Sequence, residues 1–457
     1  MDTIAAISTP SGISALGVIR LSGRESIPLL TRLFKGHKKV SSFEHHRAYV
    51  GKLIDGDTLL DDVVVIIFKA PSSYTGEDLV EISCHGGRIV LERVLKAFFK
   101  YGAKPAGPGE FTQRAFLNGK MDLLQAEAIE DIITAESELA LLAAQSLLSG
   151  KLSEKINELK TQLIELISGF EAEIEFPEED DVTDHVRQAL ESRYVLIQTI
   201  IDYLETLSDS FEQGMLMKEG FTVAIFGAPN TGKSTLLNQM IGFERALVSD
   251  QPGTTRDYIR EKIMIHGLPV TLIDMAGIRT DAGQIEKEGM EQSKRLLKES
   301  SLALFILDGT RPVSADDQLA LESCPEPIPK IWVINKIDCR MKLSIEDPLI
   351  KAKKPFLISA LKGTGMRELV LAVNESLNKR SIPQKTELVL THIRHKNSLV
   401  QARMFLSEAQ KGIKTNQESE IVVYELKNAL NELRILTGEV TVEDILSHIF
   451  SHFCIGK

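Results

Sequence analysis

A glycine-rich turn within residues 222–238 joins an apolar run to a helix-forming segment and carries the residue types that bind phosphate. Residues 227–234 read GAPNTGKS and fit the pattern G-x-x-x-x-G-K-S/T at every fixed position. Glycines in such a loop let backbone N–H groups surround a phosphate, and the dipole of the following helix adds to the attraction. Lys233 is then expected to reach the β- and γ-phosphates, and the Ser234 hydroxyl to ligate Mg²⁺. The alternative is a turn with an accidental lysine, and the strand before it and the helix after it count against that interpretation.

Four more motifs follow this loop in the sequence, at residues 253–257, 274–277, 335–338 and 359–360. Residues 335–338 (NKID) end in a carboxylate that can accept the N1–H and 2-amino hydrogens of guanine, a donor pair that adenine lacks. Residues 359–360 (SA) stand where a backbone N–H meets guanine O6. Residues 274–277 (DMAG) fit D-x-x-G, which serves the magnesium shell and the γ-phosphate, and residues 253–257 (GTTRD) supply a switch threonine. Each motif alone is weak and usually structural, but the five in this order predict a GTPase, and the guanine-reading carboxylate argues against an ATPase.

The usual glutamine that orients the attacking water is missing from this sequence. Ile278 stands where Ras-like GTPases carry that glutamine, and an apolar side chain cannot orient water. Glu286 is a candidate in the segment after D-x-x-G, although one more solvated glutamate among several is the simpler alternative from sequence alone. The sequence marks no arginine as a finger.

The apolar runs before these motifs alternate with helical stretches across residues 220–380. Six runs have the length and composition of strands: Phe221–Phe226, Lys262–Ile265, Val270–Asp274, Ala303–Asp308, Ile331–Asn335 and Phe356–Ile358. Alternation of this kind predicts a mainly parallel sheet covered on both faces, with ligands at the carboxyl ends of the strands. The polar motifs stand at those ends.

The sequence on either side of this region has two other textures. Residues 1–118 alternate short strand-like runs (15–19, 47–54, 62–68 and 79–84) with turn signals and include a helical stretch from Ile89 to Phe99, which predicts an α+β domain. Residues 119–219 and 381–457 carry apolar residues at every third or fourth position and predict helices. One such face is expected to hold Val422, Tyr424, Leu426, Leu430 and Leu433, and Thr437-Gly438 is expected to end that helix. We expect one helical bundle with the nucleotide domain inserted, rather than two unrelated helical domains, because insertion is tolerated where chain ends lie close together.

Length and composition set the broad class of the protein. A chain of 457 residues predicts about three domains, and 43% hydrophobic residues suffice for several cores. The net charge is −11, so contact with nucleic acid needs a local basic patch or a partner. Four cysteines at unpatterned spacings predict neither a disulfide framework nor a zinc site. The acidic start does not resemble a signal peptide and no apolar run approaches the about 18 residues of a membrane span, so we expect a cytoplasmic protein.

Together, the motifs resemble those of one family. GAPNTGKS, GTTRD, DMAG, NKID and SAL occur with DTIAAISTPSG near the start of the chain and CIGK at 454–457. Two further stretches, GEDLVEISCHGG at 76–87 and PGEFTQRAFLNGKMDLLQAEA at 108–128, are more specific than the GTPase motifs. Over essentially the whole chain, this set is similar to the MnmE (TrmE) family of tRNA-modification GTPases.

The resemblance implies a multidomain fold of α/β and α+β parts. These are a folate-binding N-terminal domain (1–118) related to the glycine-cleavage T-protein, a discontinuous helical bundle (119–219 and 381–457) and an inserted Ras-like P-loop GTPase domain (220–380). It implies that such a protein, with the flavoprotein MnmG, adds a carboxymethylaminomethyl or aminomethyl group at C5 of the wobble uridine of certain tRNAs. A reduced folate is the implied cofactor, as the 5-formyl or 5,10-methylene form, with the methylene form as one-carbon donor. Family members form homodimers through the N-terminal domain, and their GTPase domains meet when K⁺ and GTP are bound.

The resemblance also carries roles onto individual positions. Asn230 matches the K⁺-binding asparagine, whose cation stands where an arginine finger would, and Glu286 matches the catalytic glutamate. The implied catalytic set is Glu286, Asn230 and Cys454; the K⁺ positions are Asn230, Ser249, Gln251 and Thr254; the Mg²⁺ positions are Ser234 and Thr255; the folate positions are Arg20, Glu81, Lys120 and Lys457. The implied GTP contacts are Asn230, Thr231, Gly232, Lys233, Ser234, Thr235, Ser249, Asp250, Gln251, Pro252, Gly253, Thr254, Thr255, Asp274, Met275, Ala276, Gly277, Asn335, Lys336, Asp338, Ser359, Ala360 and Leu361. The family commonly carries Thr and an aliphatic residue where this chain has Ser249 and Gln251, but these ligands act largely through backbone carbonyls, so we expect K⁺ to bind.

Two other functions fit the GTPase motifs. An Era-like RNA-binding or ribosome-assembly GTPase without folate chemistry is expected to have a KH-like basic module in place of residues 1–118 and no need of Cys454. A nucleotide switch with a purely structural bundle is expected to bind no folate.

Overall fold

The chain divides into two compact units. Unit 1 comprises Met1–Ile133, Leu147–Leu204 and Asn397–Lys457, and unit 2 comprises Thr134–Ser146 and Glu205–Lys396. The structure, a computed structural model, describes residues 2–175, 184–243, 259–275, 296–325, 327–378, 388–440 and 443–457. Unit 1 therefore gathers segments from both ends of the sequence, while the domain boundaries expected near residues 118, 219 and 380 stay predictions.

Residues 4–105 of unit 1 contain a seven-stranded sheet. Its strands are β1 (Ile4–Ile7), β2 (Leu16–Ser22), β3 (Phe34–Gly36), β4 (Ala48–Asp55), β5 (Thr58–Phe68), β6 (Leu79–His85) and β7 (Lys104–Pro105), in the order β3-β4-β5-β6-β2-β1-β7. Neighbouring strands are antiparallel except for β1 and β7. The strand-like runs of the sequence correspond to β2, β4, β5 and β6, whereas β1 and the short β3 and β7 were not expected.

Helices α1 (Ser26–Leu33) and α2 (Arg88–Lys100) complete this α+β region, with a short 3-10 turn η1 (Val40–Ser42). Leu30, Val94 and Phe98 from the two helices are fully buried in the same core as the sheet residues Ile19 and Val65. The helical stretch expected from Ile89 to Phe99 is thus confirmed as α2. Burial of one face of each helix on the sheet supplies most of the stability of such an arrangement.

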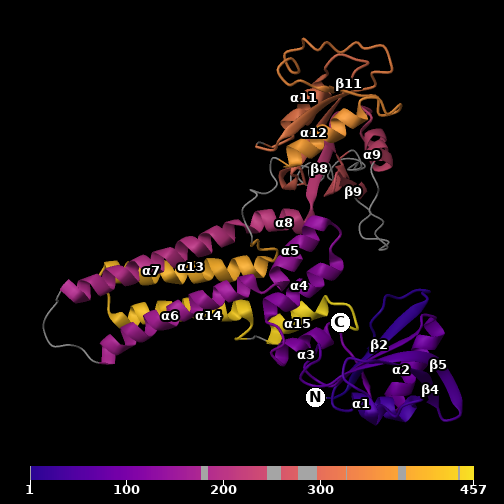
Figure 1. Cartoon of the computed structure of the whole chain (residues 1–457). Coiled ribbons are helices and arrows are strands. Elements are labelled where there is room, and N and C mark those ends of the chain that lie inside the picture. Colours follow the sequence, from indigo (N-terminus) through magenta and orange to yellow (C-terminus); the bar gives the residue numbers. More distant parts are fainter. Residues whose placement is uncertain are drawn as a thin grey trace, which may run out of the picture. The chain divides into compact units, whose positions relative to one another are not determined.

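The remaining helices come before or after the strands of unit 2 in the sequence. They are α3 (Glu110–Leu117), α4 (Leu123–Thr134), α5 (Glu138–Leu148), α6 (Lys151–Glu175), α7 (Asp184–Asp209), α8 (Phe211–Glu219), α13 (Ile393–Lys414), α14 (Ser419–Thr437) and α15 (Glu443–Ser451). In unit 1, α6 lies alongside α14, so segments from the two halves of the sequence pack together (Figure 1). Among the described helices, none is both long enough and apolar enough to cross a membrane.

The buried face of α14 differs from the predicted face at one residue. Val422, Leu426, Leu430 and Leu433 are buried, but the Tyr424 side chain is 63% exposed. At about 100° per residue, a position two residues after Val422 lies on the opposite side of the helix, so Tyr424 cannot share the apolar stripe. The predicted stop is confirmed, since α14 ends at Thr437 and Gly438 adopts the left-handed conformation that ends many helices.

Unit 2 contains the six-stranded sheet that the sequence predicts. Its strands are β8 (Phe221–Phe226), β9 (Ile259–Ile265), β10 (Leu268–Asp274), β11 (Leu302–Asp308), β12 (Lys330–Asn335) and β13 (Phe356–Leu357), in the order β13-β12-β11-β8-β10-β9. All neighbours are parallel except β9 and β10, which confirms a mainly parallel sheet. The helices described between these strands are α9 (Lys233–Phe243), α11 (Ala315–Glu322) and α12 (Met366–Asn378). Because β8 lies between two parallel strands and is nearly all buried, the loop that follows it starts from a rigid point.

The four cysteines divide into two classes that a labelling experiment can separate. Cys84 and Cys324 are buried, whereas Cys339 and Cys454 are exposed. Burial, with a smaller contribution from Asp61, raises the pKa of the Cys84 thiol to about 12. At pH 8 only about one Cys84 in ten thousand is then a thiolate.

We predict that iodoacetamide modifies Cys339 and Cys454 in the native protein, while Cys84 reacts only after unfolding in guanidinium. Peptide mass spectrometry after timed labelling measures this. The Cys84→Ser variant serves as a control for the peptide assignment. Native labelling of Cys84 at the rate of Cys454 would contradict the buried sheet described here.

Candidate functional site

The phosphate loop predicted at residues 227–234 leaves the carboxyl end of β8 and runs into α9. Two of its glycines are required by sterics. Gly227 has φ +149°, and a Cβ there would lie 2.4 Å from the Ile306 carbonyl oxygen. Gly232 has φ +93°, and a Cβ there would lie 2.3 Å from the Asn335 side-chain nitrogen. At both positions the backbone of the loop lies so close to β11 or β12 that only glycine fits.

Lys233 and Ser234 lie at the start of α9, where phosphate and Mg²⁺ were predicted. The Lys233 ammonium is buried and donates to the carbonyl oxygens of Gly227 (2.9 Å) and Ala228 (2.8 Å) inside the curve of the loop. The Ser234 hydroxyl donates to Asp274 at the end of β10 (2.6 Å). The loop thus places a cation, a helix N-terminus and two hard oxygen ligands together, a set that suits a magnesium-bound polyphosphate.

The side-chain amide of Asn335 joins the phosphate loop to the loop after β13. Its Nδ2 donates to the Thr231 carbonyl oxygen (2.9 Å), and its Oδ1 accepts the Ala360 backbone N–H (2.9 Å). Asn335 is 3% exposed, so an unpaired amide there would be costly. Two other predicted GTP positions, Thr231 and Ala360, are therefore held by one residue that needs no ligand to orient it.

The predicted guanine-reading residue Asp338 is exposed, so its carboxylate is open to a ligand. Ser359, itself buried, donates its hydroxyl to Asp338 Oδ1 (2.7 Å). This hydrogen bond is the main reason that the pKa of Asp338 lies below its ordinary value. The group is thus kept ionised and able to accept two N–H donors at neutral pH.

Asp308, at the end of β11, belongs to this site although the sequence motifs did not mark it. Its Oδ2 accepts from the Lys336 ammonium (2.7 Å), which also donates to the Asn230 carbonyl oxygen (2.6 Å). Burial raises the pKa of Asp308, but hydrogen bonds from Lys336 and Thr310 outweigh that effect and the net pKa is lowered. One feature of the sequence could have pointed to Asp308. It is an acidic residue at the end of an apolar strand, β11, and β11 lies beside β12, the strand that leads into residues 335–338 (NKID).

Lys336 and Asn230 both have left-handed backbone conformations, with φ +67° and +62°. Such conformations are uncommon in residues other than glycine and often occur at functional sites. The bond between them holds the backbone of the asparagine assigned to K⁺ against the guanine loop. The nucleotide-base end and the phosphate end of the site are thereby coupled.

The remaining predicted GTP residues divide into two groups. Thr235 and Leu361 are exposed beside the loops just described, and Met275 follows Asp274. The predictions that lie outside the described residues are Ser249, Asp250, Gln251, Pro252, Gly253, Thr254, Thr255, Ala276, Gly277 and Glu286.

A second candidate site lies in unit 1, where the C-terminal segment crosses the N-terminal sheet. The Gly456 carbonyl oxygen accepts from the Ser8 hydroxyl (3.0 Å) and from Arg20 Nη1 (3.4 Å). Ile455 pairs with Pro108 in an isolated antiparallel bridge, and the Phe111 N–H donates to the Lys457 carbonyl oxygen (3.2 Å). These bonds bring residues from the two ends of the sequence into one site.

Charged and aromatic groups surround Arg20 on β2 in this second site. Glu81, opposite it on β6, accepts two hydrogen bonds from its guanidinium (2.7 and 3.0 Å). The guanidinium also lies over the rings of Tyr74 (5.5 Å) and Phe111 (5.7 Å). Burial, and then the nearby charge of Arg20, lower the pKa of Lys457.

Of the four predicted folate residues, Arg20, Glu81 and Lys457 are thus brought together. Lys120 is exposed, and its ammonium donates to the Pro71 carbonyl oxygen (3.0 Å). Cys454 is exposed, and its carbonyl oxygen accepts from the Gly109 N–H (3.5 Å).

Comparison with known proteins gives this arrangement a context. A family model described as the MnmE helical domain matches residues 123–454, and one described as the GTP-binding protein TrmE N-terminus matches residues 3–120. The chain belongs to the MnmE family. A tRNA modification GTPase MnmE of Aquifex aeolicus is 40% identical over 461 residues, which cover 100% of each chain. Those of Acetivibrio thermocellus (39%) and Alkaliphilus oremlandii (38%) match over 462 residues, 100% of this chain and 99% of theirs.

Membership of the MnmE family confirms the resemblance inferred from the motifs. The two family models meet near residues 120–123, between α3 and α4. The individual roles assigned to site residues stay predictions.

We predict that Asp338→Asn changes the base preference of the MnmE-family site from guanine to xanthine. An amide still accepts the N1–H but donates at the position where xanthine carries a carbonyl oxygen in place of the 2-amino group. Affinity for GTP should fall by about 100-fold, or about 2.7 kcal/mol, because a mismatched pair leaves polar groups unsatisfied. Titration with fluorescent GTP and XTP analogues measures the exchange.

Ser359→Ala is the matched control for the base-preference experiment. It removes one hydrogen bond to the Asp338 carboxylate and leaves the carboxylate itself. It should therefore weaken GTP binding a few fold without favouring XTP. Tight GTP binding in Asp338→Asn would mean that the base is read by another group.

Proposed function

We propose that this protein is a K⁺-dependent GTP hydrolase that, with the flavoprotein MnmG, takes part in modifying C5 of the wobble uridine of certain tRNAs. The added group is carboxymethylaminomethyl or aminomethyl, and a reduced folate supplies the one-carbon unit. The observation that carries the proposal is the position of Gly456 and Lys457 on the N-terminal sheet beside Arg20 and Glu81. An Era-like GTPase has no need of such a site.

The groups around Arg20 fit the chemistry of a reduced folate. A folate carries glutamate carboxylates, which pair with cations such as Arg20, Lys120 and Lys457. Its pterin has several N–H donors, and the Glu81 carboxylate is an acceptor that is 27% exposed. A one-carbon carrier bound in this site would supply an electrophilic carbon, and the residues described here bind and orient it. We propose 5-formyl- or 5,10-methylene-tetrahydrofolate as the ligand.

Unit 2 supplies the hydrolysis step of this function. Ser234 with Asp274 fits the magnesium shell, and Thr255 is proposed as the second protein ligand. For K⁺, we propose Asn230 with Ser249, Gln251 and Thr254. A cation there offsets the negative charge that develops on the transferred phosphate, and Glu286 is proposed to orient the attacking water.

The proposed partners follow from the charge of the chain and from its family. With a net charge of −11, tRNA is expected to bind mainly through the complex with MnmG rather than through this chain alone. We propose a homodimer formed through the N-terminal domain. We also propose a cytoplasmic location, where a tRNA substrate would be available.

We predict that GTP hydrolysis, but not GTP binding, depends on K⁺. Turnover in NaCl should be lower than in KCl by about 10-fold or more, since a positive charge at this place in other GTPases contributes 10³-fold or more. Asn230→Ala should remove the difference between the two salts and leave GTP affinity within a few fold. Rates measured at equal ionic strength test this, and equal turnover of the unmodified protein in both salts would contradict the role of K⁺.

We predict that removal of residues 454–457 weakens binding of 5-formyl-tetrahydrofolate by about tenfold or more, because it deletes one cation and the carbonyl that orients Arg20. GTP hydrolysis should continue near its normal rate. Calorimetric titration beside a GTPase assay measures both, and unchanged folate affinity would exclude the tail from the site.

A single substitution makes the same test without shortening the chain. Gly456 has φ +99°, and a Cβ there would lie 2.5 Å from the Ile7 carbonyl oxygen, so Gly456→Ala should displace the tail. Gly56→Ala is the matched control. Gly56 also has a positive φ (+63°), but no atom lies within 4 Å of the added Cβ.

A further inference from the structure

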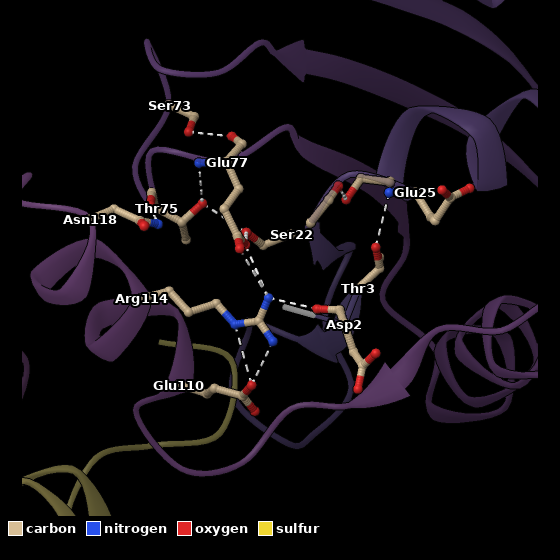
Figure 2. A network of polar contacts seen from close by, with 12 residues as sticks. Asp2, Thr3, Ser22, Glu25, Ser73, Thr75, Glu77, Glu110, Arg114 and Asn118 are labelled. Atoms are coloured by element: carbon tan, nitrogen blue, oxygen red, sulfur yellow. Dashed lines mark hydrogen bonds and ion pairs between the residues drawn. The ribbon is translucent and has the colours of Figure 1, made fainter.

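Figure 2 shows Arg114 of α3 with its guanidinium between Glu77, Glu110 and Asp2. The Arg114 side chain is only 6% exposed. Its guanidinium makes three kinds of contact. Nη1 donates to the Asp2 carbonyl oxygen (2.7 Å) and to Glu77 (3.0 Å), and Nη2 donates to Glu110 (2.8 Å). One cation therefore lies between two carboxylates and the backbone of the N-terminal segment.

The Glu77 contact leads to the strand that carries Arg20. Glu77 Oε2 accepts from the Ser22 hydroxyl (2.7 Å), and Ser22 also bonds to Thr75 (2.7 Å). Ser22 and Arg20 are two residues apart on β2, so their side chains leave the same face of the strand. The position of the loop that holds Thr75 and Glu77 is therefore fixed relative to Arg20.

The same loop also approaches Lys120. The Asn118 side chain donates to the Thr75 carbonyl oxygen (2.6 Å), and a Cβ on Gly76 would lie 3.4 Å from a carbon of the Lys120 side chain. Lys120 itself bonds to Pro71, near the start of this loop. A shift of this loop would therefore move Lys120, and it would also disturb the hydrogen bonds between the loop and Ser22 on β2.

The Glu110 contact leads to the turn that holds the C-terminal tail. Glu110 Oε2 accepts the Gly107 N–H (2.8 Å) while its Oε1 accepts from Arg114. The next residues of this turn hold the tail, because Gly109 donates to Cys454 and Phe111 donates to Lys457. Gly109 has φ +63°, and a Cβ there would lie 2.9 Å from the Phe453 Cβ, so turn and tail are in close contact.

We propose that Arg114 is a positioning residue that holds the strand bearing Arg20 and the turn bearing the tail in the relative arrangement that folate needs. The proposal rests on the proposed function for its ligand, whereas the mechanical coupling is a property of unit 1 alone. The hydrogen bonds of Arg114 do not reach Arg20 or Lys457. Its effect on them passes through Glu77 and Glu110.

The charges explain why this residue is an arginine. Two carboxylates approach one buried guanidinium, and their negative charges are offset only if that cation stays between them. Arginine presents its donors in a planar fork, so it reaches Asp2, Glu77 and Glu110 at once, whereas a lysine offers a single nitrogen. Arg114→Lys should therefore keep the charge and lose the link to one of the carboxylates.

The test compares Arg114→Met, Arg114→Lys and Glu110→Gln with a control, Arg88→Met. The control removes an exposed arginine that pairs with Glu92 one helical turn away. Glu110→Gln keeps Arg114 paired with Glu77 and weakens only the link to the turn, so it decides the question if Arg114→Met fails to fold. Hydrogen exchange of the Gly109 and Phe111 amides, which donate to the tail, reports its attachment without any ligand.

We expect faster exchange at both amides in the Arg114 and Glu110 variants, with Arg114→Lys between the unmodified protein and Arg114→Met, and no change in Arg88→Met. Affinity for 5-formyl-tetrahydrofolate should fall by about tenfold or more in Arg114→Met, while GTP turnover in KCl stays within about twofold. In protein that lacks residues 454–457, Arg114→Met should cause a clearly smaller further loss of folate affinity, because part of its effect passes through the tail.

Unchanged amide exchange in a folded Arg114→Met or Glu110→Gln variant would overturn the proposal. So would an equal loss of folate affinity in the full-length and shortened proteins, which would mean that Arg114 stabilises the domain without positioning the tail. If the unmodified protein binds no reduced folate while the exchange results hold, the proposed function fails and the coupling between turn and tail stands.

Discussion

The carbonyl group of Gly456 is the contact on which the N-terminal site depends. It accepts hydrogen bonds from Ser8 on the segment after β1 and from Arg20 on β2, and no side chain fits between Gly456 and the Ile7 backbone. Because the acceptor is a backbone carbonyl and the position has no room for a Cβ, these contacts fix the course of the tail closely. The charge of Lys457 is brought to Arg20 and Glu81 as a result, even though burial and a like charge both oppose it there.

The nucleotide site follows a similar rule, with polar groups already oriented by the protein. Asn335 bonds to the phosphate loop and to Ala360, and Ser359 bonds to Asp338. Lys336 is held between Asp308 and Asn230. A site organised in this way loses little conformational freedom on binding, so more of the contact energy is available for affinity and for the choice of base.

Short-range patterns were predictable from the sequence, whereas pairings between distant residues were not. The six strands of unit 2 and the loop after β8 follow from apolar runs and glycine spacing, which act locally. Asp308 lies outside the motifs, and the stretch at 108–128 that contains Arg114 does not reveal its contacts, because both roles depend on which strands and turns become neighbours after folding. β1 (IAAI) was missed because alanine is uncommon in strands. Tyr424 was misplaced because residues two apart on a helix lie on nearly opposite sides of it. The position of the tail was expected only through family resemblance, since no local pattern specifies a contact between residues 436 positions apart.

That separation has a consequence for the order of synthesis. Arg20 and Glu81 leave the ribosome long before residues 454–457, and the strands of unit 2 are complete in between. Domains generally fold in the order in which they emerge, so the GTP site can form while the second site still lacks its last contacts. A chain interrupted after residue 378 would carry every described strand and helix of the GTP site and none of the tail. In the proposed function, folate binding would therefore require that residues 454–457 have been synthesised, whereas nucleotide binding would not.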